Sequence, residues 1–101
     1  KKAGTAEQLM RSRYSAYCII AVDYLLNTTH PSTRKYYSGK TIKDWAEECI
    51  WQKLEIHDFS ATTVTFSAHF LDENSTPCVH REHSTFRLEN ETWYFVDGEI
   101  V

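Results

Sequence analysis

A permanent positive charge lies in the apolar stripe of the first predicted helix. Apolar residues recur at helical spacing over residues 6–24, with Arg13 near the middle of the stripe and Arg11 outside it. An arginine stays ionised in a protein, so an inward Arg13 needs hydrogen-bond acceptors or an anion inside the fold. The sequence therefore predicts a polar cluster within the core.

A carboxylate is predicted on the facing surface of a strand. Period-two alternation places Glu82 on the side that buries Phe86. A bidentate ion pair would satisfy Arg13 and Glu82 together, and Tyr17, one helical turn from Arg13, can donate its hydroxyl to the same carboxylate. Two interpretations remain open: a structural ion pair that fixes helix against sheet, or a partly open cavity whose polar cluster holds a ligand.

Aromatic and titratable residues elsewhere in the chain extend this candidate site. Aromatic side chains are more often core residues than ligand platforms, unless they surround a cavity. Asp97 lies two residues from Phe95 and so can face inward, although Asp97-Gly98 is most simply a turn. The predicted pocket or buried polar cluster consists of Arg13, Tyr14, Tyr17, His30, Glu82, Trp93 and Asp97.

Cysteine and histidine offer weaker catalytic and metal-binding candidates. Cys78, His80 and Glu82 alternate onto one strand face, so a thiol–imidazole–carboxylate line is conceivable. Nucleophilic catalysis also needs an oxyanion site, and none can be identified. His80 and His83 point to opposite faces of a strand and do not form the helical HExxH pair of zinc proteases. We therefore predict no catalytic residue, no metal and no cofactor in this chain.

Capping residues and hydrophobic periodicity predict three helices in the first half of the chain. Thr5 and Gln8 form a capping box for the first helix. His30 precedes a proline, which disfavours helical backbone at that residue, so the helical segment ends there. Residues 31–40 have the composition of a loop, and Thr41 opens the third helix.

Around residues 18–22 the chain is apolar on every side of the predicted helix. Either a bend into a second helix over residues 23–28 or a contact surface would explain this pattern. The contact surface would be a homodimer interface through Ile19 and Val22. Both explanations remain open on the sequence alone.

After Trp51 the hydrophobic period changes to two. Four alternating segments, separated by the turn signals DFSATT, DENSTP and ENET, predict an antiparallel meander. Helices followed by a sheet indicate an α+β domain, with three N-terminal helices packed on one face of a curved four-stranded antiparallel sheet.

Length, charge and cysteine content indicate which binding partners and which cellular compartment to expect. The 101 residues suit a single domain, 1–101, and the net charge of −3 argues against nucleic-acid binding. No apolar run approaches the roughly 20 residues that span a membrane. Three widely spaced cysteines without a CxxC pair indicate reduced thiols and a cytoplasmic location. The first residue is not Met and the chain stops abruptly, so we expect a domain excised from a longer chain.

Seven motifs carry a family resemblance, in the chain order TAEQLMRSRYSAY, DYL, HPSTR, LEI, VTFSAHF, EHSTF and WYFVDG. Over nearly its whole length the chain resembles the uncharacterised YchJ family. The resemblance implies a nuclear-transport-factor-2-like, cystatin-like cone: helices folded onto a curved sheet with a cavity between. It also implies SEC-C zinc motifs flanking the domain. The family commonly has Trp where Thr29 stands, which predicts a larger cavity at that end.

Two functions follow as expectations. The first is a non-catalytic small-ligand-binding or docking module, with a polar pocket around Arg13, Tyr17 and Glu82 and a small molecule as partner. The alternative is an isomerase- or dehydratase-type enzyme with a pocket carboxylate as general base. A carboxylate locked by an arginine would have a depressed pKa and be a poor base, which favours binding.

Overall fold

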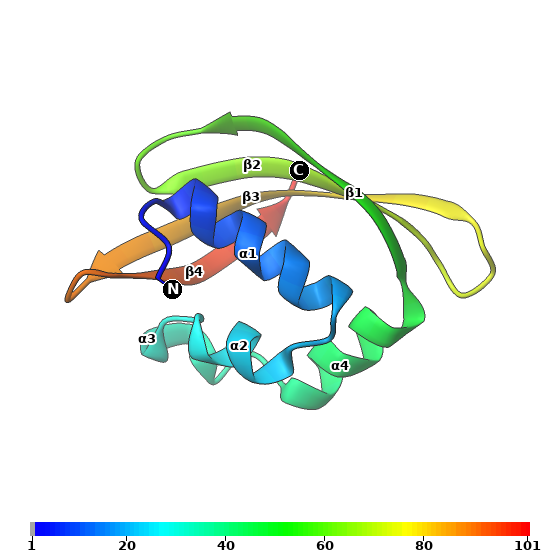
Figure 1. Cartoon of the computed structure of the whole chain (residues 1–101), viewed down its shortest axis with the longest axis horizontal. Coiled ribbons are helices and arrows are strands. Elements are labelled where there is room, and N and C mark those ends of the chain that lie inside the picture. Colours follow the sequence, from blue (N-terminus) through cyan, green and yellow to red (C-terminus); the bar gives the residue numbers. More distant parts are fainter. Residues whose placement is uncertain (1) are drawn as a thin grey trace.

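The computed structural model describes residues 2–101 and confirms the α+β architecture. The elements run in the order α1 (Ala6–Cys18), α2 (Val22–Asn27), α3 (Pro31–Arg34), α4 (Gly39–Glu48), β1 (Ile50–Phe59), β2 (Thr63–Leu71), β3 (Pro77–Glu89) and β4 (Thr92–Ile100). The sheet is an antiparallel meander in the order β1-β2-β3-β4. Figure 1 shows the sheet curving over α1, with all four helices on its concave side.

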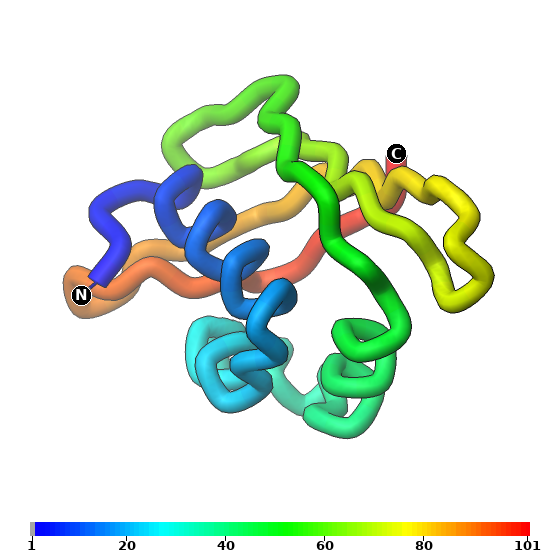
Figure 2. Tube along the Cα trace, turned by 45° about the vertical axis from the view of Figure 1, so that its right-hand side comes forward, coloured from blue at the N-terminus to red at the C-terminus, as the bar shows by residue number. Residues whose placement is uncertain are grey.

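The first helix begins at the predicted cap. The hydroxyl of Thr5 accepts from the backbone N–H of Gln8 at 3.1 Å, and the Gln8 side chain accepts from the backbone N–H of Gly4 at 2.7 Å. The apolar stripe faces the sheet, so α1 lies across the concave surface (Figure 2). Arg13 is buried on this face, as its position in the stripe predicts.

A break after α1 explains the all-round apolar segment. Ile20 has φ 58°, a left-handed conformation that a β-branched residue rarely adopts, and α2 then starts at Val22. The turn brings Val22 partly into a second core cluster around Leu25, while Ile19 stays 77% exposed. The bend that the sequence predicted as one explanation is therefore present. Self-association through Ile19 and Val22 stays a prediction.

The helices after α2 differ from the sequence predictions in two places, and α2 itself begins and ends one residue earlier than predicted. Residues 31–34 form the short helix α3 instead of a loop, because the Pro31 ring presets a helical φ and the His30 side chain accepts from the Ser32 N–H at the helix start. α4 begins at Gly39, two residues earlier than predicted, because the hydroxyl of Ser38 caps the N–H of Thr41.

Two apolar clusters hold the layers together. The larger one lies between α1 and the sheet and contains Ala6, Leu9, Met10, Val64, Phe66, Ala68, Phe86 and Phe95. The smaller one joins α1, α2 and α4 through Ala16, Leu25 and Ile42. No helix within residues 2–101 has the length and apolar character needed to cross a bilayer.

The segment after α2 pairs with the outer edge of the sheet. Thr29 forms a parallel bridge with Phe95 of β4: the Phe95 N–H donates to the Thr28 carbonyl at 2.8 Å, and the His30 N–H donates to the Phe95 carbonyl at 2.7 Å. This bridge fixes the layer of α2 and α3 against β4.

A bulge changes which side chains of β4 face inward. Thr85 pairs with Asp97 but Phe86 pairs with Phe95, so Val96 is an extra residue on β4. Both Asp97 and Gly98 lie within β4, and the turn predicted for them is wrong. Because side chains alternate, the bulge turns Gly98 toward the concave side and Asp97 away from it.

Candidate functional site

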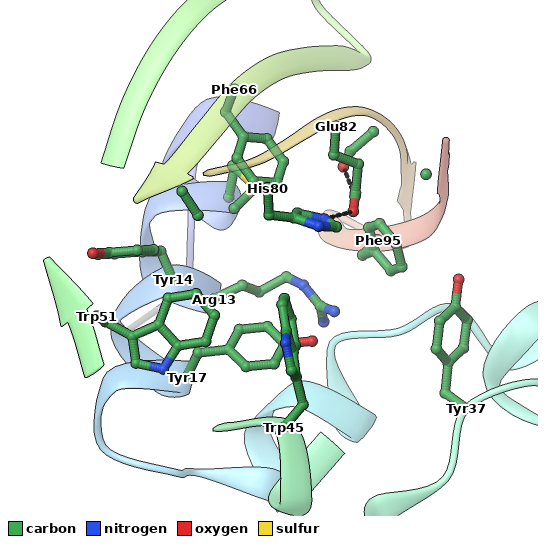
Figure 3. Close-up of a pocket in the computed structure, with 14 residues that line it drawn as sticks. Arg13, Tyr14, Tyr17, Tyr37, Trp45, Trp51, Phe66, His80, Glu82 and Phe95 are labelled. Atoms are coloured by element: carbon green, nitrogen blue, oxygen red, sulfur yellow. Dashed lines mark hydrogen bonds and ion pairs between the residues drawn. The ribbon is translucent and has the colours of Figure 1, made fainter. Parts of the chain in front are cut away.

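A cavity of about 190 Å³ lies between α1 and the concave face of the sheet. Seven of its wall residues have aromatic side chains: Tyr14, Tyr17, Tyr37, Trp45, Trp51, Phe66 and Phe95. Its polar wall consists of Arg13, His80, Glu82 and Ser84. Figure 3 shows the Arg13 side chain extending between Glu82 and Phe95 on one side and Tyr17 and Trp45 on the other.

Arg13 is held by neutral acceptors. Its Nη1 donates to the Leu25 carbonyl at 2.8 Å and to the hydroxyls of Thr28 at 2.7 Å and Thr29 at 3.4 Å. The guanidinium carbon lies 4.4 Å from the ring centre of Phe95, a cation–π contact. Burial lowers the pKa of Arg13, although its charge remains at any ordinary pH.

Glu82 is held by its own strand. Its carboxylate accepts from His80 Nε2 at 2.8 Å and from the hydroxyl of Ser84. His80 precedes Glu82 by two residues and Ser84 follows it by two. Burial raises the pKa of Glu82, but these two hydrogen bonds, together with the electrostatic effects of His80 and Arg13, lower it below the usual range. Gly98 leaves room for this carboxylate, since a β-carbon there would overlap the Glu82 side chain.

The predicted ion pair between Arg13 and Glu82 does not form. Both residues line the cavity, yet within residues 2–101 they make no hydrogen bond or ion pair with each other. Tyr17 also makes no hydrogen bond to the carboxylate among these residues. The reason is that each charge finds closer partners in its own neighbourhood, Arg13 at the end of α2 and Glu82 along β3.

The rings of the cavity wall pack edge to face. Trp45 and Trp51 meet at 5.1 Å between ring centres, and Tyr17 lies 5.4 Å from Trp45. Burial raises the pKa of Tyr17 and of Tyr37, so both phenols stay neutral hydrogen-bond donors at ordinary pH. The buried Nε1 of Trp51 has no hydrogen-bond partner within residues 2–101.

The structure brings four of the seven predicted pocket residues together: Arg13, Tyr14, Tyr17 and Glu82. The other three lie outside the cavity. Asp97 is exposed on the opposite face of β4, because of the bulge. The Trp93 indole donates to the Gly4 carbonyl at 3.3 Å, near the chain start.

His30 is buried elsewhere, at the start of α3. Its Nδ1 accepts from the backbone N–H of Ser32 at 3.1 Å, so the ring proton is on Nε2, which donates to Glu89 at 3.2 Å. Thr29 is fully buried against the Leu25 carbonyl and does not line the cavity, so its small side chain does not enlarge it.

The thiol–imidazole–carboxylate line forms only in part. His80 bonds to Glu82, whereas the Cys78 thiol bonds to the Thr76 carbonyl at 3.4 Å and makes no contact of this kind with His80. Within residues 2–101, no group of three or more His, Cys, Asp or Glu side chains is placed to hold a metal ion. The absence of cofactors stays a prediction.

Sequence reasoning missed several wall residues. Trp45 and Trp51 are not among the predicted pocket residues, and neither is His80, although its period-two relation to Glu82 is visible in the sequence. Tyr37 comes from the segment after α3, where no periodic pattern exists to place it. Gly98 could be found only through the bulge of β4.

Comparisons with known proteins point to one family. The family model described as "YchJ, middle NTF2-like domain" matches residues 5–98. A UPF0225 protein of Geobacter sulfurreducens is 39% identical over 105 residues, which cover 97% of this chain and 65% of that protein. A UPF0225 protein of Haemophilus influenzae is 39% identical and is covered over 62% of its length. The chain thus spans less than two thirds of the length of these relatives.

Solved structures share the fold. The solution structure of a SEC-C motif containing protein from Rhodopseudomonas palustris has a TM-score of 0.91 and 34% identity, covering 100% of this chain and 82% of that chain. The crystal structure of a SEC-C motif containing protein from Psychrobacter arcticus has a TM-score of 0.83 and 34% identity, with 63% of that chain covered.

Proposed function

This chain belongs to the YchJ family, as a middle NTF2-like domain, and we propose that it is a non-catalytic module that binds a small molecule between α1 and the sheet. The observation that carries the proposal is the cavity of about 190 Å³, which combines aromatic walls with a few convergent polar groups. An engineered cavity of about 150 Å³ binds benzene, so this one suits a ligand of about one ring with substituents.

The walls favour binding because they are already in place. Tyr17, Trp45 and Trp51 restrain one another through their edge-to-face contacts, and the ring centre of Phe70 lies 5.3 Å from that of Trp51. A preformed wall reduces the ordering cost that a ligand would otherwise have to offset. Trp45 comes from α4 and Trp51 from β1, so the wall also joins two elements.

A second candidate is an isomerase- or dehydratase-type enzyme. The observation that favours it is the 2.8 Å hydrogen bond between His80 and Glu82 inside an aromatic cavity, since a carboxylate that orients an imidazole is a common acid–base arrangement. Against a role for Glu82 itself as base, the hydrogen bonds from His80 and Ser84 hold its pKa below the usual range. A base that already accepts two donors takes up a proton poorly.

The test uses the tryptophan side chains as internal reporters. Trp45 and Trp51 line the cavity whereas Trp93 does not. We expect p-cresol, a neutral one-ring phenol, to shift the indole N–H signals of Trp45 and Trp51 in ¹⁵N-labelled protein and to leave that of Trp93 unchanged. No selective shift up to about 10 mM, a concentration above the range of weak fragment binding, would contradict the proposal.

A matched pair of variants checks that the cavity itself is responsible. Ala68→Leu adds three carbons to a buried wall position, so it should abolish the p-cresol shifts. Ala61→Leu makes the same change at an exposed turn position and should leave them intact. Equal shifts in both variants would place the binding site elsewhere.

A further inference from the structure

We propose that the ligand of this cavity is a small monocarboxylate with a ring-sized apolar body, and that its carboxylate is held by the guanidinium of Arg13. The inference rests on the proposed function and adds the chemical class of the ligand. It rests on the hydrogen bonds that Nη1 of Arg13 donates and on the lack of acceptors for Nε and Nη2 among the described residues.

Arg13 uses only one of its three nitrogens. All three hydrogen bonds come from Nη1, and within residues 2–101 neither Nε nor Nη2 has an acceptor. Nε and Nη2 lie along one edge of the planar guanidinium and present two parallel N–H groups. A carboxylate accepts this pair through its two oxygens, which is the bidentate geometry that distinguishes arginine from lysine.

Within residues 2–101, no negatively charged group is hydrogen-bonded to Arg13 either. The residue is only 6% exposed, and its partners are a carbonyl and two hydroxyls, which carry no negative charge. Glu82, which lines the same cavity, is engaged by His80 and Ser84 instead. Glu82 acts on Arg13 only through space, so an anionic ligand gains affinity by placing its charge in direct contact with the buried guanidinium.

Trp51, another wall residue, also has a donor without a partner among residues 2–101. The Nε1 of Trp51 is buried without an acceptor. Buried N–H groups are nearly always paired in native proteins, and an unpaired one calls for an explanation. The Trp51 Nε1 atom is itself closed off, so the acceptor oxygens that a ligand brings are matched to Arg13.

The remaining walls limit the charge and shape of the ligand. Glu82 shares the cavity and would repel a dianion such as a phosphate monoester more strongly than a monoanion. The Tyr, Trp and Phe side chains that make up half of the wall residues favour a flat apolar body over a polyol or a nucleotide. A volume of about 190 Å³ accommodates one ring and its carboxylate.

The experiment compares benzoate with benzyl alcohol, a neutral molecule of similar size, through the indole N–H signals of Trp45 and Trp51. We expect benzoate to bind about tenfold more tightly at low salt, because a charge-assisted bidentate contact replaces a neutral one. Equal affinities would overturn the carboxylate assignment and leave the proposed function standing. Binding of neither probe would contradict both.

Substitutions locate the carboxylate contact. Arg13→Gln should remove the preference for benzoate, whereas Arg11→Gln, on the exposed side of the same helix, should retain it. Retention of the preference in Arg13→Gln would overturn the proposal.

A third variant covers the case in which Arg13→Gln does not fold. Glu82→Gln removes the negative charge from the cavity, so benzoate should bind about threefold or more tightly while benzyl alcohol is unchanged. An unchanged or weakened benzoate affinity in Glu82→Gln would also contradict the assignment.

Discussion

The helix wall and the sheet wall of the cavity each carry one buried charge, and they stabilise it differently. Arg13 on α1 bonds to the end of α2, so its side chain ties two helices together, and two of its nitrogens have no acceptor in the described part of the chain. Among the described residues, Glu82 on β3 bonds only to residues two positions away on its own strand. The helix wall therefore combines a structural tie with spare binding capacity, whereas the sheet wall is locally satisfied.

The largest effect is expected from removing the structural tie. Arg13→Met leaves the Leu25 carbonyl without its charged donor and should lower the free energy of unfolding by about 2 kcal/mol, as measured by urea denaturation. Arg11→Met is the control: Arg11 is exposed and pairs only with Glu7 at 3.0 Å, so the loss should be about 0.5 kcal/mol or less. An equal loss of unfolding free energy in the two variants would contradict the prediction that the buried arginine stabilises the fold more than the exposed one.

A smaller effect is expected from crowding the sheet wall. A β-carbon at position 98 overlaps the Glu82 carboxylate, so Gly98→Ala should cost about 1–2 kcal/mol and weaken the bond between Glu82 and His80. Gly39→Ala is the matched control, because its β-carbon meets Leu26 and Val22 at an ordinary 3.4 Å. The comparison is made by measuring the thermal unfolding of both variants. A Gly98→Ala protein as stable as the wild type would show that the Glu82 side chain moves aside without cost, which would contradict this prediction.

The smallest effect is a pH dependence confined to the sheet wall. The folded-state pKa of Glu82 is depressed, so its ionised form stabilises the fold above the unfolded pKa of about 4.3, and this contribution is lost as the pH falls through the folded value. Glu82→Gln should therefore differ most from the wild type near pH 6 and converge with it in acid. Glu47→Gln, at an exposed position of α4, should follow the wild type throughout, and a constant Glu82→Gln difference down to pH 3 would argue against the depressed pKa.

Sequence patterns predicted the elements well because local periodicity determines them. The cap at Thr5, the inward position of Arg13 and the four strands all follow from spacing within a few residues. Local patterns also placed Glu82 on the inner face of β3, where it lines the cavity.

The partners of these side chains could not be predicted in the same way. Arg13 bonds to α2 because the break at Ile20 brings that helix alongside, and no spacing rule gives the angle of such a break. The bulge at Val96 shifts the alternation of β4 by one residue, which turns Asp97 outward and Gly98 inward. The helix break and the β-bulge depend on tertiary structure, and neither is marked by a pattern in the amino-acid sequence.

The bridge between Thr29 and Phe95 has a consequence for aggregation. β4 is an outer strand of the sheet, and an unpaired outer strand is a template on which another chain can add. The backbone bonds from residues 28–30 occupy part of that template within the same molecule. The opposite outer strand, β1, is protected in another way: its two register irregularities and its charged Lys53 and Asp58 interrupt a regular pairing surface. Each margin of the sheet thus carries its own protection against fibre-like growth.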